Sequence, residues 1–256
     1  MRNRMNRHLA LLAAEFALAA CAVTAGGQGA AMKRQPYTAE YRITLVRTLA
    51  NGATITHVTK SVKAMDSEGR LMQASTPIGT DGTPKPDSTF LRISDPVAGT
   101  SGSWMGWRKT GSITKFPPRD EQRGCWADAN RSESINYEPS AQPPPGQPPY
   151  LKPVNEDLGT ETIMGLEAHG RRTILTIPTG GVGNDRPLLR TSEEWAAKNP
   201  PITLRYSFND PLMGKEIMEL VSLSLNAPDP ALFQPPANYK TVTVALHQVP
   251  CPPSAR

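Results

Sequence analysis

Residues 37–62 read YTAEYRITLVRTLANGATITHVTKSV, and this stretch decides the fold. The apolar side chains of Tyr41, Ile43 and Leu45 are separated by polar ones, and this period of two indicates a half-buried strand. Asn51-Gly52 favours a tight hairpin turn in which both residues take positive φ. The β-branched residues that follow it predict the returning strand of an antiparallel hairpin.

The rest of the chain repeats this pattern of short strands and turns. Its 26 prolines and 20 glycines favour a mainly antiparallel β fold of roughly ten to twelve strands. Asp229, as an N-cap, and Pro230, at the first helical position, predict one helical turn. Further strands are expected at 70–74, 88–93, 103–107, 112–116, 160–164, 171–177, 194–195, 202–206, 215–225 and 241–246.

Residues 117–153 interrupt the strand pattern. Nine prolines lie in this segment, which favours polyproline II and excludes a central strand. We therefore expect a single β-rich domain at 37–249 with a proline-rich insertion at 117–153. Residues 250–256 form a tail.

The first residues have the composition of a secretory signal. Arg2, Arg4 and Arg7 precede a short apolar run that ends in small residues. The run is shorter than the ~20 residues needed to span a bilayer. We expect a signal peptide at 1–20 and a flexible tether at 21–36. An alternative start at Met32 would remove this segment.

Two cleavage sites compete within this region. Leu18-Ala19-Ala20-Cys21 resembles a bacterial lipobox, which implies diacylglycerol on Cys21 and cleavage just before it. Ala22, rather than an aspartate, follows the cysteine, so this resemblance implies the outer membrane. Val23-Thr24-Ala25 instead fits ordinary signal cleavage, which would release the protein.

The three cysteines agree with export. Lipidation or removal of Cys21 leaves Cys125 and Cys251, which could pair in an oxidising compartment. Two unpaired thiols are the alternative. Neither a CxxC motif nor a Cys/His cluster is present, so we expect no metal site.

Charge and motifs exclude several classes of function. Cleavage before Cys21 lowers the net charge from +5 to +3, since 25 basic and 22 acidic side chains remain. This charge is spread along the chain, which argues against nucleic-acid binding. Ser101 lacks the last glycine of a nucleophile elbow, so a turn serine is expected. His57, His169 and His247 have no ligand spacing, and we expect no catalytic set and no cofactor.

The tryptophans are the largest apolar side chains. Trp104, Trp107 and Trp195 are candidates for an aromatic-lined groove that binds an apolar ligand. Packing in the core is the alternative for each.

The second half of the chain resembles uncharacterised exported bacterial β-proteins and, more distantly, the lipoprotein-carrier half-barrel group. The resemblance implies a curved antiparallel sheet or half-barrel with few short helices. The chain lacks the long early helices that close the cavity in that group, and the resemblance supplies no catalytic residues. The matching residues are Leu158-Gly159-Thr160, Thr162-Ile163, Gly165-Leu166, Ala168, Gly183-Asn184-Asp185-Arg186-Pro187, Glu194-Trp195, Asp210-Pro211, Gly214, Glu216, Asp229-Pro230-Ala231-Leu232-Phe233, Pro235-Pro236 and Tyr239, with Ser94-Asp95-Pro96 and Ala98-Gly99 in the first half.

These observations predict an exported cell-envelope protein, periplasmic or anchored in the outer membrane by a lipid, or secreted if it is not lipidated. We expect a non-catalytic binding module for an apolar ligand, such as a lipid, or for a protein partner. A secreted hydrolase with a site assembled from dispersed Asp, Glu and His residues is the alternative. A structural module that pairs through a sheet edge is a third.

Overall fold

The computed structural model describes residues 34–117, 125–128, 134–136 and 153–249. The chain divides into two compact units, Met1–Met32 and Lys33–Arg256, and every described residue belongs to the second. In these ranges, no helix is long and apolar enough to cross a membrane.

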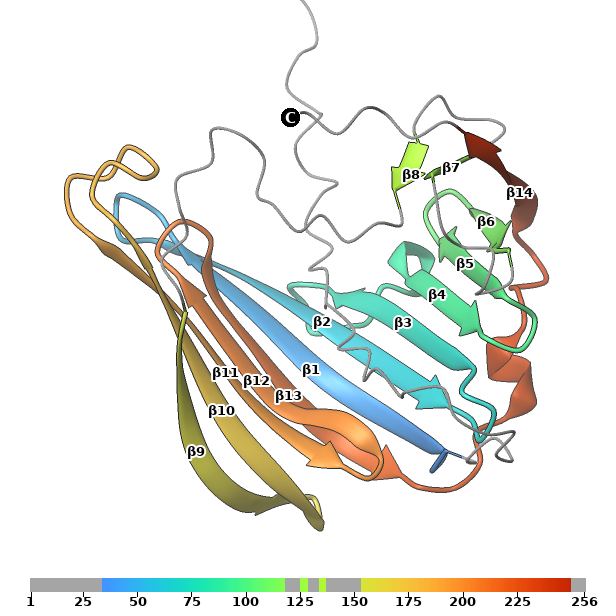
Figure 1. Ribbon diagram of the computed structural model, residues 1–256, viewed down its shortest axis with the longest axis horizontal. Coiled ribbons are helices and arrows are strands. Elements are labelled where there is room, and N and C mark those ends of the chain that lie inside the picture. The colour runs from blue at the N-terminus through green and yellow to red at the C-terminus, as the bar shows by residue number, and fades with distance from the viewer. Residues whose placement is uncertain (1–33, 118–124, 129–133, 137–152, 250–256) are drawn as a thin grey trace, which may run out of the picture. The chain divides into compact units, whose positions relative to one another are not determined.

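The described residues form fourteen strands and two short 3₁₀ helices (Figure 1). The strands are β1 (Tyr37–Thr48), β2 (Thr54–Met65), β3 (Leu71–Ile78), β4 (Phe90–Asp95), β5 (Thr100–Met105), β6 (Thr110–Lys115), β7 (Cys125–Asp128), β8 (Ser134–Asn136), β9 (Val154–Ile163), β10 (Leu166–Ile177), β11 (Leu188–Lys198), β12 (Pro201–Asp210), β13 (Gly214–Ser224) and β14 (Lys240–Val249). The 3₁₀ helices are η1 (Pro86–Ser88) and η2 (Pro230–Phe233).

All strands belong to one curved sheet with the order β8-β7-β14-β6-β5-β4-β3-β2-β1-β13-β12-β11-β10-β9 (Figure 1). Neighbouring strands pair antiparallel, except that β14 runs parallel to β6. The sheet is open, with β9 at one edge and β8 at the other. The prediction of a mainly β fold with a curved antiparallel sheet is confirmed.

The first hairpin forms where the sequence predicts it, but with a different turn. Thr48 pairs with Thr54, which leaves a five-residue loop. Gly52 has φ +82°, whereas Asn51 is absent from the residues with positive φ. The Gly52 N–H donates to the Leu49 carbonyl at 2.9 Å, as in a type I turn that ends on a left-handed glycine. The expectation of positive φ at both central residues is therefore wrong.

Two short strands lie inside the segment predicted as a proline-rich insertion. β7 pairs with the end of β14, and β8 pairs with β7. Neither strand contains a proline, so each keeps the backbone donors that a ladder needs. Part of this segment therefore forms strands at one end of the sheet, although no strand was predicted there.

The predicted helical turn is present as η2. The Asp229 carboxylate accepts a hydrogen bond from the Ala231 N–H at 2.9 Å, and Pro230 occupies the first helical position. Phe233 at its end is buried, and the Arg70 guanidinium lies 5.3 Å from the centre of its ring. Nε of Arg70 lies 2.6 Å from the Asp66 carboxylate in the β2–β3 turn, so η2 contacts that turn through Arg70.

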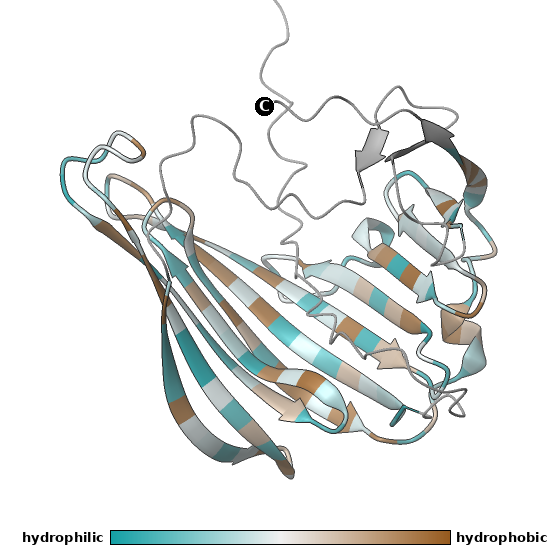
Figure 2. Ribbon diagram, viewed as in Figure 1, coloured by the Kyte–Doolittle hydropathy of each residue, from teal (hydrophilic) through white to brown (hydrophobic). Residues whose placement is uncertain are grey.

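The sheet has two faces with different surroundings. We call the face that carries Tyr41, Lys63, Arg92 and Ser103 the inner face, because the sheet curves around it in Figure 1. The opposite face, which carries Trp104, is the outer face. Figure 2 shows the hydrophobic and hydrophilic residues alternating along many of these strands, as the period of two requires.

A core cluster covers the outer face of β2 to β6. Trp104 is 1% exposed and its indole N–H donates to the Thr241 hydroxyl at 2.9 Å. This bond links β5 to β14 across β6, and η2 covers the cluster through Phe233. The buried members are Ala64, Met72, Ile93, Trp104 and Phe233, with Val62, Ala74, Leu91, Ile113 and Tyr239 packed against them.

A second cluster fills the region where β12 and β13 separate. Pairing between these strands begins at Arg205 and Glu219, and the preceding residues of β12 pair with β11 alone. The buried Tyr41 of β1 reaches into this region, where its hydroxyl donates to the Thr203 carbonyl at 2.9 Å. The buried members are Tyr37, Ala39, Tyr41, Met65, Ala168, Trp195, Ala197, Ile202, Leu204 and Met218.

A buried ion pair fixes the turn between β12 and β13. The side chain of Asp210 has no exposed surface, and its carboxylate lies 2.6 Å from Nε of Arg190 on β11. The same carboxylate accepts a hydrogen bond from the Leu212 N–H at 2.7 Å. Gly214 completes the turn with φ +101°, and a Cβ there would collide with the Val46 carbonyl of β1.

Several predictions concern residues that lie outside the described ranges. These are the signal peptide at 1–20, the lipidation residue Cys21, most of the tether, the disulfide partner Cys251 and the tail. For Cys125 the structure describes only the backbone, as the first residue of β7. Lipidation and the disulfide therefore stay predictions.

We predict that Asp210→Asn destabilises the protein by about 3 kcal/mol, because it leaves the Arg190 guanidinium without its buried counter-charge. Urea unfolding measures this change. The matched control is Glu161→Gln, which breaks the Arg205–Glu161 pair, whose side chains are 42% and 44% exposed. Such a pair contributes at most about 1 kcal/mol. Equal effects of the two substitutions would contradict the structural role given to Asp210.

Candidate functional site

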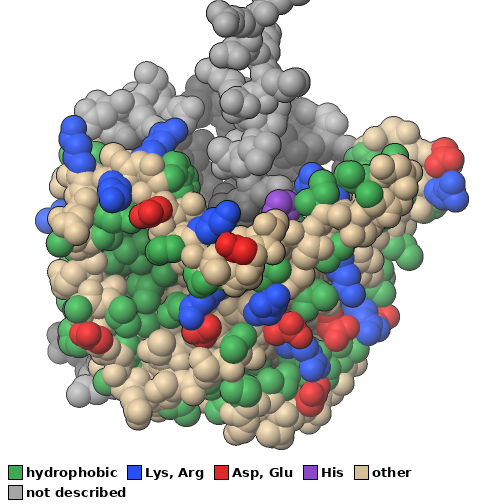
Figure 3. Space-filling model, turned by 180° about the vertical axis from the view of Figure 1, so that it is seen from behind, with side chains coloured by type: hydrophobic (Ala, Val, Ile, Leu, Met, Phe, Trp, Pro, Cys, Tyr) green, Lys and Arg blue, Asp and Glu red, His purple; other side chains and the backbone are tan. Residues whose placement is uncertain are grey.

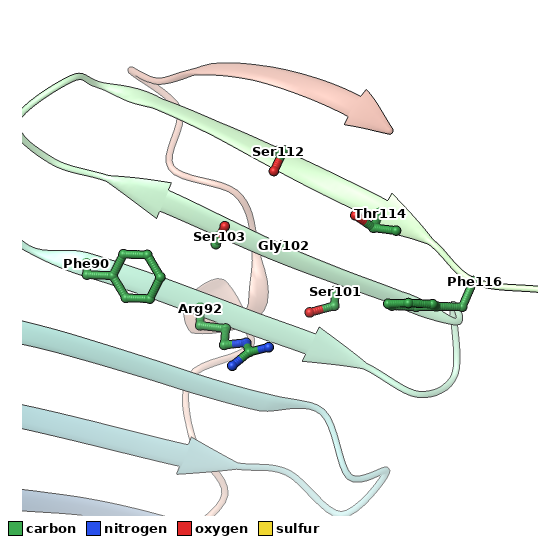
Figure 4. A pocket seen from close by; sticks show the side chains of 8 residues that line it. All are labelled: Phe90, Arg92, Ser101, Gly102, Ser103, Ser112, Thr114 and Phe116. Carbon is green, nitrogen blue, oxygen red and sulfur yellow. The ribbon is translucent and has the colours of Figure 1, made fainter. Parts of the chain in front are cut away.

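An open pocket of about 340 Å³ lies on the inner face of β4, β5 and β6. Figure 4 shows Phe90 and Phe116 at opposite ends of the pocket, with Arg92 and short hydroxyl side chains between them. The lining residues are Phe90, Arg92, Ser101, Gly102, Ser103, Ser112, Thr114 and Phe116.

Strand register places the polar groups of this pocket in rows. Arg92 on β4 pairs with Ser103 on β5, which pairs with Ser112 on β6. Ser101 pairs with Thr114 in the next row on the same face. Directly paired residues have Cβ atoms about 4.5–5.5 Å apart, so one arginine and four hydroxyl side chains rise from neighbouring positions on the same face.

The backbone beneath the pocket is held by the outer-face core. A Cβ at Gly102 or at Gly111 would collide with the Trp104 indole, which therefore lies flat against β5 and β6. Leu91, Ile93 and Ile113 of the same strands belong to this cluster. The pocket thus rests on a closely packed part of the sheet, and its side chains are positioned by strands rather than by loops.

Arg92 is the only charged residue among those that line the pocket. No ion pair or hydrogen bond joins its guanidinium to another described residue. A guanidinium offers five N–H donors in a plane and binds carboxylate or phosphate oxygens in pairs. The hydroxyls of Ser103 and Ser112 can add further donors to the same acceptor.

The described residues that line the pocket include several hydroxyls. A serine nucleophile needs a base within hydrogen-bond reach. Among the described residues that line the pocket, none is a histidine or a carboxylate. In the described ranges no group of three or more His, Cys, Asp and Glu side chains could hold a metal ion.

Buried polar side chains occupy the inner face next to the pocket strands. Burial lowers the pKa of Lys63, which the Glu194 carboxylate partly offsets, and burial raises the pKa of Tyr41. The Lys63 ammonium lies 5.2 Å from the centre of the Tyr41 ring. Ser61 on the same strand is fully buried, and no described residue forms a hydrogen bond with its hydroxyl. These polar side chains lie beside apolar ones, because Tyr37, Ala39 and Met65 of the second cluster share the inner face with them.

The three tryptophans predicted to line a groove lie in different surroundings. Trp104 belongs to the outer-face core. Trp195 is 9% exposed, packs against Gly170, and donates through its indole N–H to Glu193 at 3.1 Å. Trp107 is 56% exposed in the β5–β6 turn. The structure does not bring the three rings together, and ligand binding by any of them stays a prediction.

Sequence reasoning missed the residues of the pocket. Ser101 was expected in a turn, but it lies in β5 and contributes its hydroxyl to the inner face. Phe90, Arg92 and Phe116 were not singled out. The available signal was the spacing of two in the segments of β4 to β6. Once the strands pair, this spacing places Arg92, Ser103 and Ser112 on one face, whereas Asp95, Thr100 and Lys115 fall on the other.

The histidines remain apart from this site. His57, His169 and His247 are exposed on β2, β10 and β14. Of these, His169 lies 3.5 Å from the exposed Asp157 carboxylate.

We predict that Glu216→Gln stabilises the protein at pH 7. Burial raises the pKa of Glu216 on the inner face of β13, so the folded state retains its proton to higher pH than the unfolded state. Wild-type stability therefore falls as pH rises above about 4.3, the pKa of an unfolded glutamate. Urea unfolding at pH 7 should give the variant a larger free energy of unfolding than wild type. Near pH 3.5 the two free energies should be equal. A variant that is less stable at pH 7 would contradict this assignment.

Comparisons with known proteins find low similarity to solved structures. No protein-family model matches the chain, and no curated protein matches it. An uncharacterised conserved protein from Thermus thermophilus is 10% identical, with a TM-score of 0.41 over 82% of this chain and 90% of that one.

Two further solved structures have names that refer to lipoprotein sorting or to the LolA superfamily. A putative outer membrane lipoprotein-sorting protein domain from Vibrio parahaemolyticus is 11% identical, with a TM-score of 0.32 over 77% of this chain and 88% of that one. A LolA superfamily protein from Nitrosomonas europaea is 9% identical, with a TM-score of 0.27 over 79% and 91% of the two chains. The resemblance expected from the sequence thus recurs among solved structures, and no ligand or partner follows from similarities of this size.

Proposed function

We propose that this protein binds an apolar ligand, or a protein partner, at the bacterial cell envelope and does not transform it. The observation that carries the proposal is the open inner-face pocket, which has aromatic rings at both ends and hydroxyls between them but no base among its described lining residues. The pocket combines two aromatic side chains with five polar ones, so it offers both apolar surface and hydrogen-bond partners to a ligand.

The charged side chains of the outer face pair with one another, and this pairing favours the inner face as the binding surface. Figure 3, which views the molecule from behind, shows acidic and basic side chains interspersed on this surface. Arg172 pairs with Glu156 and with Glu193, each at 3.1 Å, and Arg205 pairs with Glu161 at 2.7 Å. Charges that satisfy one another in this way leave little net attraction for a ligand.

We predict that the protein purified from an exporting bacterial host retains an apolar compound. Mass spectrometry of an organic extract should detect it at close to one molecule per chain. Phe90→Ser should lower this amount, because it removes one aromatic end of the pocket. Leu189→Ser, which removes an exposed apolar side chain on β11, is the matched control and should leave the amount unchanged.

Two results would overturn the proposal. An extract without any ligand, together with failure to capture a stable partner from the host, would remove the binding function. Turnover of ester or glycan substrates by the wild-type protein would favour the alternative, a hydrolase with a site made from dispersed Asp, Glu and His residues.

Export and anchoring are part of the same proposal. We predict that the mature protein begins at Cys21 and carries a diacylglyceryl group there, which intact-mass measurement of the membrane fraction would detect. Cys21→Ser should yield soluble protein without this mass. A wild-type chain that begins after Ala25 would show ordinary signal cleavage, and one that begins at Met1 or Met32 would contradict export. The same measurement with and without reduction tests the proposed Cys125–Cys251 disulfide, which changes the mass by about two hydrogens.

A further inference from the structure

We propose that the inner-face pocket holds the oxyanion head of an amphiphile, a carboxylate or phosphate joined to an apolar body. This inference rests on the proposed binding function and specifies the chemistry of its ligand. It is carried by three features of the described residues: a guanidinium without a counter-charge, hydroxyls in register with it, and aromatic rings at both ends.

The guanidinium of Arg92 has no carboxylate partner among the described residues. The same is true of the exposed strand residues Arg42, Arg47 and Arg171, but of these four arginines Arg92 alone lines the pocket. Arg172, Arg190 and Arg205 each bind a carboxylate, at 3.1, 2.6 and 2.7 Å respectively. Arg92 binds no described carboxylate and lines the pocket, where Figure 4 shows its exposed side chain lying along β4. A carboxylate or phosphate oxygen pair matches its planar donors, and such bonds are stronger than those between neutral groups.

The hydroxyls complete a site for an oxyanion. Ser103 and Ser112 follow Arg92 in one row across β4, β5 and β6, with strands about 4.8 Å apart. Hydroxyls can rotate to donate, so these two can bind oxygens of the group that the guanidinium holds. Ser101 and Thr114 form the next row along the strands. A single acceptor group with several oxygens can use donors from both rows.

The aromatic ends favour an amphiphile over a free inorganic ion. Phe90 stands at one end of the hydroxyl rows and Phe116 at the other (Figure 4). Phe90 is 37% exposed, so it offers ring surface that an apolar chain can cover. A volume of about 340 Å³ exceeds what a bare phosphate fills and lies near the lower end of small-molecule pockets.

Isothermal titration calorimetry with four probes tests this inference. The probes are decanoate, decyl phosphate, decan-1-ol and inorganic phosphate. The three probes with a decyl chain are used below the concentrations at which they aggregate. We expect decanoate and decyl phosphate to bind more tightly than decan-1-ol, because only they offer oxyanion acceptors. Raising the salt concentration should weaken decanoate binding and leave decan-1-ol binding unchanged. Inorganic phosphate should bind weakly, since it cannot use the aromatic ends.

Substitution of the guanidinium provides the second arm. Arg92→Gln should weaken decanoate binding by about tenfold to hundredfold, the range expected for hydrogen bonds to a charged group. Arg92→Lys should restore part of this loss, because it keeps the charge without the planar donors. The matched control is Arg108→Gln, which removes an exposed arginine in the β5–β6 turn outside the pocket and should bind decanoate like wild type.

The outcomes separate this inference from the proposed function. If decan-1-ol binds as tightly as decanoate, or if Arg92→Gln binds decanoate like wild type, the inference of an oxyanion site is wrong. The proposal that the protein binds an apolar ligand is then unaffected. If inorganic phosphate binds as tightly as decyl phosphate, the amphiphile is wrong and the site takes a free ion. If no probe binds, the inference is wrong, and the host extract alone then decides the proposed function.

Discussion

The alternation of side chains across β4, β5 and β6 is the constraint on which the candidate site depends. On the outer face these strands contribute Leu91, Ile93 and Trp104 to a closely packed core. The next residues along each strand must then point to the inner face, which places Arg92 and Ser103 there. A shift of one residue in the strand register would exchange the inner-face and outer-face residues. Such a shift would expose the core around Trp104 to water, and this cost excludes it. Packing on one face therefore determines the chemistry of the other.

The outer-face core is itself held from two directions. Trp104 fits against β5 and β6 because positions 102 and 111 carry glycine, and its indole N–H binds Thr241 of the parallel strand β14. Phe233 of η2 covers the cluster and contacts Arg70 of the β2–β3 turn. Segments from the first third and from the end of the chain thus support the same three strands. This support explains how an open pocket of short side chains can keep a defined geometry without loops of its own.

Much of the fold could be predicted from the sequence because its rules are local. The period of two at Tyr41, Ile43 and Leu45 predicts β1, and Asp229 with Pro230 predicts η2. The turn at Gly52 required tertiary information, since the same dipeptide fits more than one hairpin loop. The parallel pairing of β14 with β6 was also beyond local rules, because it joins segments about 130 residues apart.

The candidate site was hidden from sequence reasoning for a different physical reason. Arg92, Ser103 and Ser112 come from three strands, and only the register of the sheet aligns them. No motif links such residues along the chain. The tryptophans attracted attention through their size, yet size is equally the reason why Trp104 and Trp195 are buried. A strand pattern predicts which residues share a face. Which face is available for binding depends on tertiary packing, because here the outer face is covered by Phe233 of η2.

A crystal structure of the protein with bound decanoate tests the central claim most directly. The account predicts electron density for the carboxylate within hydrogen-bond distance of the Arg92 guanidinium, with the chain running along the inner face toward Phe90 or Phe116. Density on the outer face, or a carboxylate bound away from Arg92, would contradict it.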